Sequence, residues 1–249
     1  MGSALRKVKL VIRTVPGRPV ARRGCSERRQ LELLLRDYIS VVAPKLAAPA
    51  LAQRLAQRYE SLALILEAQP QDLILEGATK SLARQLTFIP DLARYMRTES
   101  VLKSKQKLCT KRTCGDYFAA RCFGLLHECV IVICLGKRGD TKGIFDMAEG
   151  TDDEVPIYPR EIIRRALQCD AHYLVLCHNH PSGTRASSAM DVEVTRALME
   201  ICKHARIVVL DHLIVADSDV VSMREDEGRT QEFLNQAPND KINLHWAQD

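Results

Sequence analysis

The segment from residue 178 to residue 191 carries metal-binding side chain types at a telling spacing. His178 and His180 alternate, so in extended backbone both imidazoles emerge from one face. Asp191 follows eleven residues after His180, about one turn into an expected helix. Two imidazoles and one carboxylate are a typical catalytic zinc set, and three protein ligands leave a fourth position for water. Zinc lowers the pKa of such a water towards ~7, which makes hydroxide available at neutral pH.

Hydrolysis also needs a group that moves a proton and a group that stabilises developing charge. Glu128, at the start of an expected strand, is the candidate general acid/base. Ser188 lies one helical turn before Asp191, where its hydroxyl could donate to an oxyanion. Plainer roles exist, because Ser188 suits a helix N-cap, Asp191 a first-turn acid and His178 a strand end. The joint spacing of the residues favours the catalytic interpretation.

The elements expected around this segment alternate between strands and helices. His178 to Gly183 is predicted to be a polar loop, broken by proline and glycine, that follows a short buried strand. The pattern predicts strands at 128–135, 142–147, 173–177, 206–210 and 212–216, with helices at 117–126, 159–168 and 188–204. Such a mixture indicates an α/β domain with a partly antiparallel sheet.

The first third of the chain is expected to be entirely helical. Residues 27–36, 47–66, 71–75, 80–86 and 90–96 show helical patterns, with Ser26 as a plausible N-cap for the first. Seven basic residues and no acid lie within residues 1–26, which is typical of a frayed terminus that can contact nucleic acid. The expected organisation is a basic arm (1–26), a helical domain (27–99), a linker (100–113), an α/β domain (114–228) and a C-terminal tail (229–249).

Composition excludes several classes of protein. The chain has 249 residues, 46% hydrophobic and 27% charged, as in soluble globular proteins. No apolar run approaches the ~18 residues of a membrane helix, so we expect no membrane partner. The nine cysteines form no CxxC pair, and no secretion signal is visible. We therefore expect free thiols and a reducing, cytoplasmic location.

The spacing His-x-His-x7-Ser-x2-Asp with an upstream Glu resembles the JAMM motif of MPN-domain zinc metallopeptidases. The longer string HNHPSG and the later DHLIV, residues 211–215, resemble the bacterial RadC (UPF0758-type) family. The resemblance implies an α/β, cytidine deaminase-like JAMM/MPN domain with Zn²⁺ held by His178, His180 and Asp191. It also implies Glu128 as general acid/base and Ser188 as oxyanion donor. Family members commonly carry a proline just before this serine, where this chain has Ser187.

The helical third resembles the helix-hairpin-helix-like region of the same family, which binds DNA backbone through a Gly-x-Gly turn. Here the turn reads Gly77-Ala78-Thr79, without the second glycine that lets backbone approach phosphate closely. A packing role for this region is therefore favoured, and we expect at most weak, sequence-independent DNA contact.

The leading hypothesis is a zinc-dependent hydrolase that cleaves a peptide or isopeptide bond in a protein or peptide substrate. An HNH nuclease is disfavoured, since its three named residues are spread over a ββα unit. A nucleobase deaminase needs H-x-E and P-C-x-x-C, and neither occurs. The alternative is a DNA-associated accessory protein whose metal site is not used for proteolysis.

Asp211 and His212 allow two roles. His212 could hydrogen-bond to a ligating histidine, which is a common need of metal sites, or act as a further polar group near the water. Asp211 and His212 suit equally a strand-end pair that hydrogen-bonds to loops.

Overall fold

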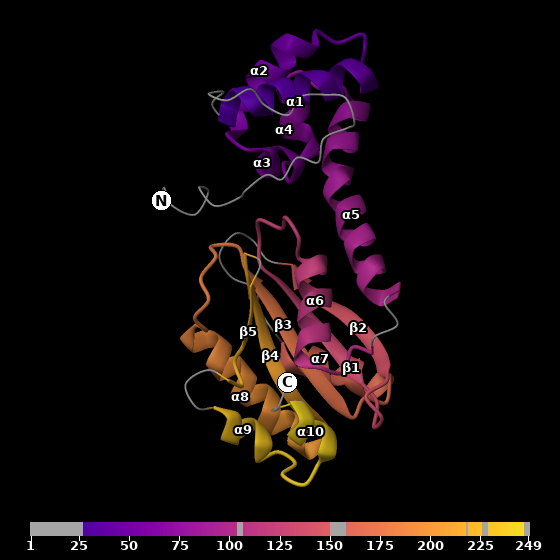
Figure 1. The fold of residues 1–249 in the computed structure, drawn as a ribbon, viewed down its shortest axis with the longest axis vertical. Coiled ribbons are helices and arrows are strands. Elements are labelled where there is room, and N and C mark those ends of the chain that lie inside the picture. Colours follow the sequence, from indigo (N-terminus) through magenta and orange to yellow (C-terminus); the bar gives the residue numbers. More distant parts are fainter. Residues whose placement is uncertain (1–26, 104–106, 150–157, 218, 226–228, 247–249) are drawn as a thin grey trace. The chain divides into compact units, whose positions relative to one another are not determined.

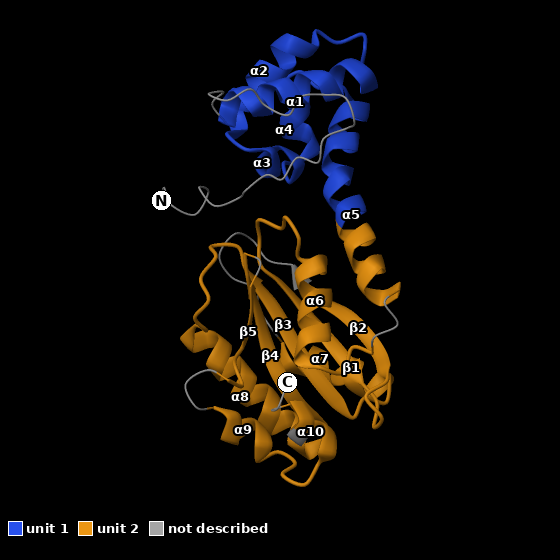
Figure 2. Ribbon diagram, viewed as in Figure 1, with its two compact units in different colours: residues 1–93 blue, residues 94–249 orange. Residues whose placement is uncertain are grey.

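The computed structural model describes residues 27–103, 107–149, 158–217, 219–225 and 229–246. The chain divides into two compact units, residues 1–93 and residues 94–249 (Figure 2). The boundary lies inside a helix, a few residues before the expected domain boundary at residue 99. The basic arm and the Ser26 cap lie outside the described residues.

The first unit is helical, as expected. Its elements are α1 (Glu27–Val42), α2 (Ala48–Tyr59), α3 (Leu62–Leu66), α4 (Pro70–Leu75) and the first part of α5 (Lys80–Lys103). Leu35, Leu55, Ile65, Leu73 and Leu82 are at most 1% exposed and form the centre of one apolar core. Within α1, the buried residues Leu31, Leu35 and Ile39 recur every four residues, so this helix turns one stripe inward.

Two details of the helical unit differ from the expected pattern. The single helix predicted at 47–66 is two helices, because Glu60 adopts a left-handed φ of 57° and the Ser61 side chain caps the next helix. The pieces predicted at 80–86 and 90–96 form one helix, α5, which continues through Pro90. A proline removes one backbone donor, and here the helix persists on both sides of it. Since α5 ends at Lys103 and α6 begins at Lys111, the expected linker (100–113) is shorter than predicted.

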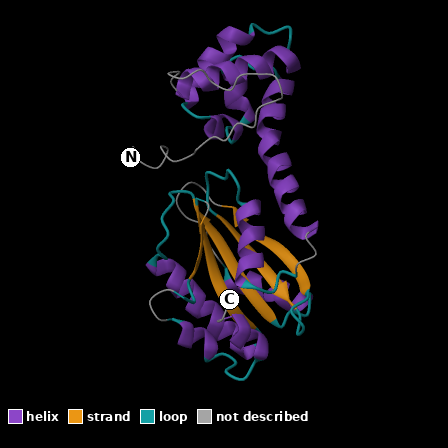
Figure 3. Cartoon of the chain, viewed as in Figure 1, coloured by secondary structure: helices purple, strands orange, loops and turns teal. Residues whose placement is uncertain are grey.

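The second unit contains a mixed five-stranded sheet, which confirms the predicted α/β class (Figure 3). Its strands are β1 (Cys129–Leu135), β2 (Thr141–Glu149), β3 (Tyr173–His180), β4 (Val208–Ala216) and β5 (Asp219–Ser222). The strand order is β2-β1-β3-β4-β5, and β3 and β4 form the parallel pair. The helix α8 (Ala189–His204) connects these two parallel strands.

Helices cover both faces of the sheet, as the alternation of its side chains requires (Figure 1). On one face, Ile131, Val175 and Leu213 pack with residues of α6 (Lys111–Arg121) and with Trp246 of α10 (Lys241–Trp246). The opposite face packs against α7 (Pro159–Gln168), α8 and α9 (Thr230–Leu234). β3 therefore directs odd-numbered side chains to α6 and even-numbered ones to α8.

Several expected bounds in this unit were wrong. β3 continues through His178 to His180, because both residues still pair with Ile214 and Ala216 of β4. The strands predicted at 206–210 and 212–216 are one strand, whose irregularity near residue 210 is a register shift. The helix predicted at 117–126 starts earlier, at Lys111, where Thr110 forms a capping box, and ends at Arg121. β5 was not predicted.

The segment 229–249 was expected to be a tail, but its described part packs into the apolar core of the second unit. Phe233 of α9 is 1% exposed and Trp246 of α10 is 2% exposed. The Trp246 indole donates a hydrogen bond of 2.9 Å to Asp211 of β4. The sequence does not reveal this packing, because α9 and α10 are too short to show a clear helical repeat of apolar residues.

Among the helices that the structure describes, none combines the length and apolar character needed to cross a membrane.

Candidate metal centre

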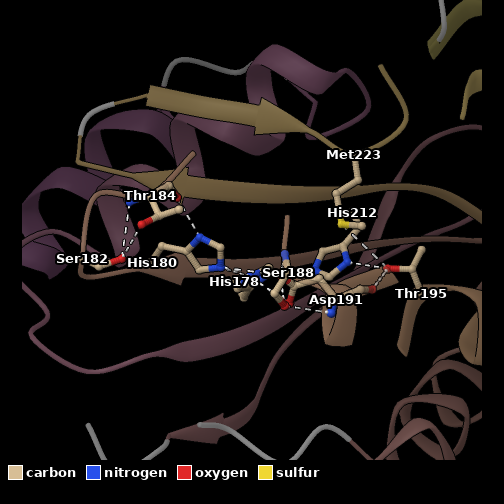
Figure 4. A network of polar contacts seen from close by, with 9 residues as sticks. All are labelled: His178, His180, Ser182, Thr184, Ser188, Asp191, Thr195, His212 and Met223. Atoms are coloured by element: carbon tan, nitrogen blue, oxygen red, sulfur yellow. Dashed lines mark hydrogen bonds and ion pairs between the residues drawn. The ribbon is translucent and has the colours of Figure 1, made fainter. Parts of the chain in front are cut away.

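The candidate ligands meet where β3 ends and α8 begins (Figure 4). His178 and His180 stand on the α8 face of β3, as their alternation predicts, and Asp191 lies in the first turn of α8. Their potential ligand atoms all lie within 4.8 Å of one another. Two segments separated by a loop thus bring the predicted set together.

The three side chains converge through specific atoms. His178 Nε2 lies 2.8 Å from His180 Nε2 and 3.3 Å from Asp191 Oδ1. Asp191 Oδ2 lies 3.6 Å from His180 Nε2. Zinc bonds of about 2.0–2.1 Å at tetrahedral angles separate donor atoms by roughly 3.3 Å. The carboxylate distances fit this spacing, and the two imidazoles need to part by only a few tenths of an ångström.

The protonation of His180 follows from the loop that it contacts. Its Nδ1 lies 2.7 Å from the carbonyl oxygen of Thr184, which can only accept, so Nδ1 carries the proton and donates. Gly183 turns the loop back with a φ of +74°, and a Cβ there would lie 2.8 Å from Asp217 Oδ2. Glycine is therefore needed for the turn that places the Thr184 carbonyl. The Nε2 lone pair of neutral His180 then faces Asp191 and His178.

The protonation of His178 follows from a buried chain of hydrogen bonds. The Thr195 hydroxyl lies 2.5 Å from the Asp191 carbonyl oxygen and donates its single proton there. It can then only accept from His212 Nδ1, at 2.6 Å. His212 Nε2, at 2.7 Å from His178 Nδ1, accepts in turn from His178. The Nε2 lone pair of His178 is left facing the other two candidate ligands.

This series of hydrogen bonds requires a neutral His212, and the burial of the residue explains why it is neutral. His212 is 0% exposed, and burial lowers its pKa well below the ordinary value. A neutral imidazole has one N–H, so a proton on Nδ1 leaves Nε2 as an acceptor. Of the two roles left open by the sequence, the structure places His212 directly behind His178, and Asp211 elsewhere.

The donor set fits a divalent cation. Two imidazole lone pairs and one carboxylate point at a common position, and lone pairs that face one another repel unless a positive charge lies between them. The electrostatics of Asp191 agree with this. Burial raises its pKa, but interactions with His178 and His180 in their protonated, positively charged form outweigh burial and hold the pKa far below the ordinary value. A hydrogen bond that protonated His180 donates to Asp191 raises the pKa of His180. The site therefore presents an ionised carboxylate beside groups that favour a positive charge.

Ser188 has the capping role that its position suggested. Its Oγ accepts from the Asp191 backbone N–H at 3.1 Å and donates to Asp191 Oδ2 at 2.7 Å. Its own backbone N–H also donates to Asp191 Oδ2, at 2.7 Å. The residue is exposed. Because the cap uses a lone pair of Oγ, its hydroxyl proton can turn to another acceptor without loss of the cap.

Glu128 lies directly before β1, which pairs with β3 so that Val130 faces His178. Val130 belongs to the α8 face of the sheet and Cys129 to the opposite face. By alternation, Glu128 is on the same face as the candidate ligands. The residue is partly exposed, and its charge contributes to raising the pKa of His180. The structure thus brings the predicted acid/base to the side of the metal set.

Asp211 is a buried carboxylate that accepts hydrogen bonds from several elements of the second unit. It is 0% exposed and accepts from Ser222 Oγ at 2.6 Å, Trp246 Nε1 at 2.9 Å and two backbone amides. Burial raises the pKa of Asp211 to about 6, against these hydrogen bonds, which lower it. Asp211 therefore ties β5 and α10 to β4, the strand that also carries His212.

Sequence reasoning missed three residues that shape the site: Asn179, Thr184 and Thr195. Thr195 lies one helical turn after Asp191 on the same face of α8, a spacing that could have identified it. Thr184 acts through its backbone carbonyl, which leaves no side-chain signal. Asn179 lies between the two histidines and points to the opposite face of β3, away from the apparent motif.

Comparison with known proteins shows the family of this chain. The model of the RadC-like JAB domain family matches residues 108–229. A UPF0758 protein of Pseudomonas fluorescens is 32% identical over 207 residues, which cover 80% of this chain and 88% of that protein. A UPF0758 protein of Bordetella petrii is 33% identical over 217 residues, 84% of this chain and 93% of that protein.

The family match spans the whole sheet with α6, α7 and α8, and includes every candidate ligand described above. The UPF0758 relatives also extend over most of the helical unit. The resemblance inferred from the motif is confirmed, and this chain belongs to the RadC-like JAB domain (UPF0758) family.

Proposed function

We propose that this protein is a zinc-dependent metallohydrolase of the JAMM type that cleaves a peptide or isopeptide bond. The observation that carries the proposal is the convergence of His178 Nε2, His180 Nε2 and the Asp191 carboxylate, while Nδ1 of each imidazole has a hydrogen-bond partner of its own. A set of three protein ligands that leaves a fourth position for water is typical of catalytic rather than structural zinc sites.

Each residue near the centre has a separate task in the proposed reaction. When bound, zinc acts as a Lewis acid that lowers the pKa of water to about 7. The Glu128 carboxylate accepts a proton from the attacking water and returns it to the leaving nitrogen, as general base and then general acid. The Ser188 hydroxyl turns from Asp191 Oδ2 to donate to the oxyanion that develops on the scissile carbonyl.

The position of Ser188 makes its two roles compatible. Its backbone N–H still holds Asp191 Oδ2, so the carboxylate keeps its orientation when the hydroxyl proton turns away. Its Oγ still accepts from the Asp191 amide, so the cap of α8 is retained. The exposed side chain can reach a substrate, while Asp191 beneath it is only 8% exposed.

The test uses the full chain and two substrate pools. One pool contains internally quenched linear peptides of mixed sequence, and the other contains peptides joined through a lysine side chain. We expect cleavage in at least one pool, inhibition by a zinc chelator and recovery on addition of one equivalent of zinc. Which pool is cleaved distinguishes the peptide from the isopeptide class.

The control is Glu128→Gln, which keeps the shape of the side chain but cannot carry the proton. We expect this variant to bind zinc like the parent and to lose on the order of 10²-fold or more of the rate. A zinc-loaded parent that leaves both pools intact would contradict the proposal and favour the DNA-associated alternative. Equal rates for the parent and Glu128→Gln would remove Glu128 from the mechanism.

A further inference from the structure

Asn179, between the two histidines, has no assigned role, yet it is one of the most constrained polar residues of the second unit. It is 4% exposed and lies on β3 with its side chain on the face opposite to His178 and His180. A buried carboxamide must satisfy both its oxygen and its NH₂ group, so its partners indicate what it holds.

Both partners of the Asn179 side chain are backbone groups beside Glu128. Its Oδ1 accepts from the Cys129 N–H at 2.7 Å, and its Nδ2 donates to the His127 carbonyl oxygen at 3.0 Å. The orientation of the amide is fixed, because Cys129 N–H can only donate and the carbonyl can only accept. The side chain therefore contacts the chain immediately before and immediately after Glu128.

The hydrogen bonds of the Asn179 side chain lie directly beyond the last backbone pair of β1 and β3. The pairing of β1 with β3 runs from Leu135–Tyr173 to Val130–His178 and stops there. One step further, the Asn179 side chain supplies the partner that a ladder would have supplied. It thereby extends the ordered part of β1 past Cys129 to His127, and Glu128 lies inside the extension.

The same residue is covalently bound to both histidine ligands. A displacement of β3 that moved His178 and His180 would carry Asn179 with it, and through Asn179 the backbone of Glu128. The β1–β3 ladder fixes the chain as far as Val130, and beyond it the Asn179 side chain holds the backbone on both sides of Glu128. A misplacement of about 1 Å at a reacting group can cost on the order of 10²-fold in rate.

We propose that Asn179 is a positioning residue that clamps the backbone of Glu128 to the strand carrying the metal ligands. This inference rests on the proposed function, because Glu128 is taken as the general acid/base. It assigns the middle residue of the His-x-His sequence a task on the opposite face of the sheet: it touches neither substrate nor metal and acts through Glu128.

The first arm of the test measures the clamp without any substrate. In Asn179→Leu, which has a similar volume and no hydrogen-bonding groups, the Cys129 amide loses its acceptor. We expect its hydrogen exchange to be at least 10-fold faster than in the parent. The Ile133 amide, in the middle of β1 and fully buried, is the internal control and keeps its rate. An unchanged Cys129 rate would overturn the clamp.

The second arm measures action through Glu128 by a double-mutant cycle. We expect Asn179→Leu to bind zinc like the parent, to lower kcat roughly 10- to 100-fold and to change KM less than 3-fold. In a Glu128→Gln background, the same substitution should change the residual rate less than 2-fold, since the group it positions is already disabled. An equal loss of rate in both backgrounds would overturn the proposal.

Two controls keep the arms interpretable. Asn179→Ala removes the same hydrogen bonds without added bulk, so agreement between the two variants excludes a steric effect of leucine. Zinc content and the fluorescence of Trp246, the only tryptophan, report whether each variant is folded. A parent protein that cleaves neither substrate pool would overturn the proposed function and with it the catalytic part of this inference. The amide exchange arm would still decide whether the clamp exists.

Discussion

Removal of the Thr195 hydroxyl should weaken zinc binding although Thr195 does not touch the metal position. Thr195→Val leaves the Nδ1–H of His212 without an acceptor, and His212 is 0% exposed. A buried donor left unpaired costs about 1–3 kcal/mol. His212 can avoid this penalty by moving its proton to Nε2, which faces His178.

That proton shift has a direct consequence for the ligand. With a proton on His212 Nε2, His178 Nδ1 must accept, and the proton of His178 moves to Nε2, the atom that should bind zinc. Either the penalty is retained or the ligand is in the wrong tautomer. Outer hydrogen-bond partners of ligating histidines typically contribute 10- to 100-fold in metal affinity. We therefore expect a zinc dissociation constant raised 10- to 100-fold, or about 1.4–2.7 kcal/mol.

The assay is competition with a chromogenic zinc chelator at constant pH. Thr195→Ser retains the hydroxyl and should bind like the parent. Thr98→Val is a matched control, because Thr98 also donates to the carbonyl four residues earlier in a helix, Arg94 of α5, and is 9% exposed. It should leave zinc affinity unchanged. An affinity of Thr195→Val within 2-fold of the parent would refute the tautomer argument.

Three further substitutions test other parts of the site. Ser188→Ala should lower kcat roughly 10²- to 10³-fold with zinc retained, whereas a stable Ser188→Asn with parent-like kcat would leave only the cap. Gly183→Ala should weaken zinc binding, because an alanine at a φ of +74° strains the turn that places the Thr184 carbonyl; parent-like affinity would contradict this. Burial raises the pKa of Asp211 to about 6 from 3.8. The protonated carboxyl of Asp211 therefore stabilises the folded state below about pH 4, and this contribution to the free energy of unfolding falls by about 3 kcal/mol as the pH rises to 6. Urea unfolding of the metal-free proteins, followed by Trp246 fluorescence, measures this effect. The difference in free energy of unfolding between the parent and Asp211→Asn should narrow from pH 4 to pH 7, and a constant difference would contradict the prediction.

The convergence of His178, His180 and Asp191 was predictable because its signal is local. The alternation in His-x-His and the distance to Asp191 need only a strand followed by a helix, and both periods are visible in the sequence. Glu128 required a longer inference. Its place beside the candidate ligands depends on the pairing of β1 with β3, which no local pattern determines; the family resemblance implied its role but not this pairing.

The partners behind the ligands were less predictable for a physical reason. His212 reaches His178 only through the parallel pairing of β3 with β4, and Asn179 reaches His127 only where the antiparallel pairing of β1 with β3 ends. The sequence placed Trp246 in a tail, because a six-residue helix is too short to show a repeating pattern of buried positions. Long-range pairing, rather than propensity, decides all three contacts.

The most direct test of the account is the metal content of the purified full chain. Elemental analysis should find about one zinc per chain in the parent protein after mild purification. The double variant His178→Ala, His180→Ala should contain essentially none and should take up none when zinc is added. A parent protein without metal that also fails to bind added zinc would contradict the account at its centre, as would an equal zinc content in the double variant.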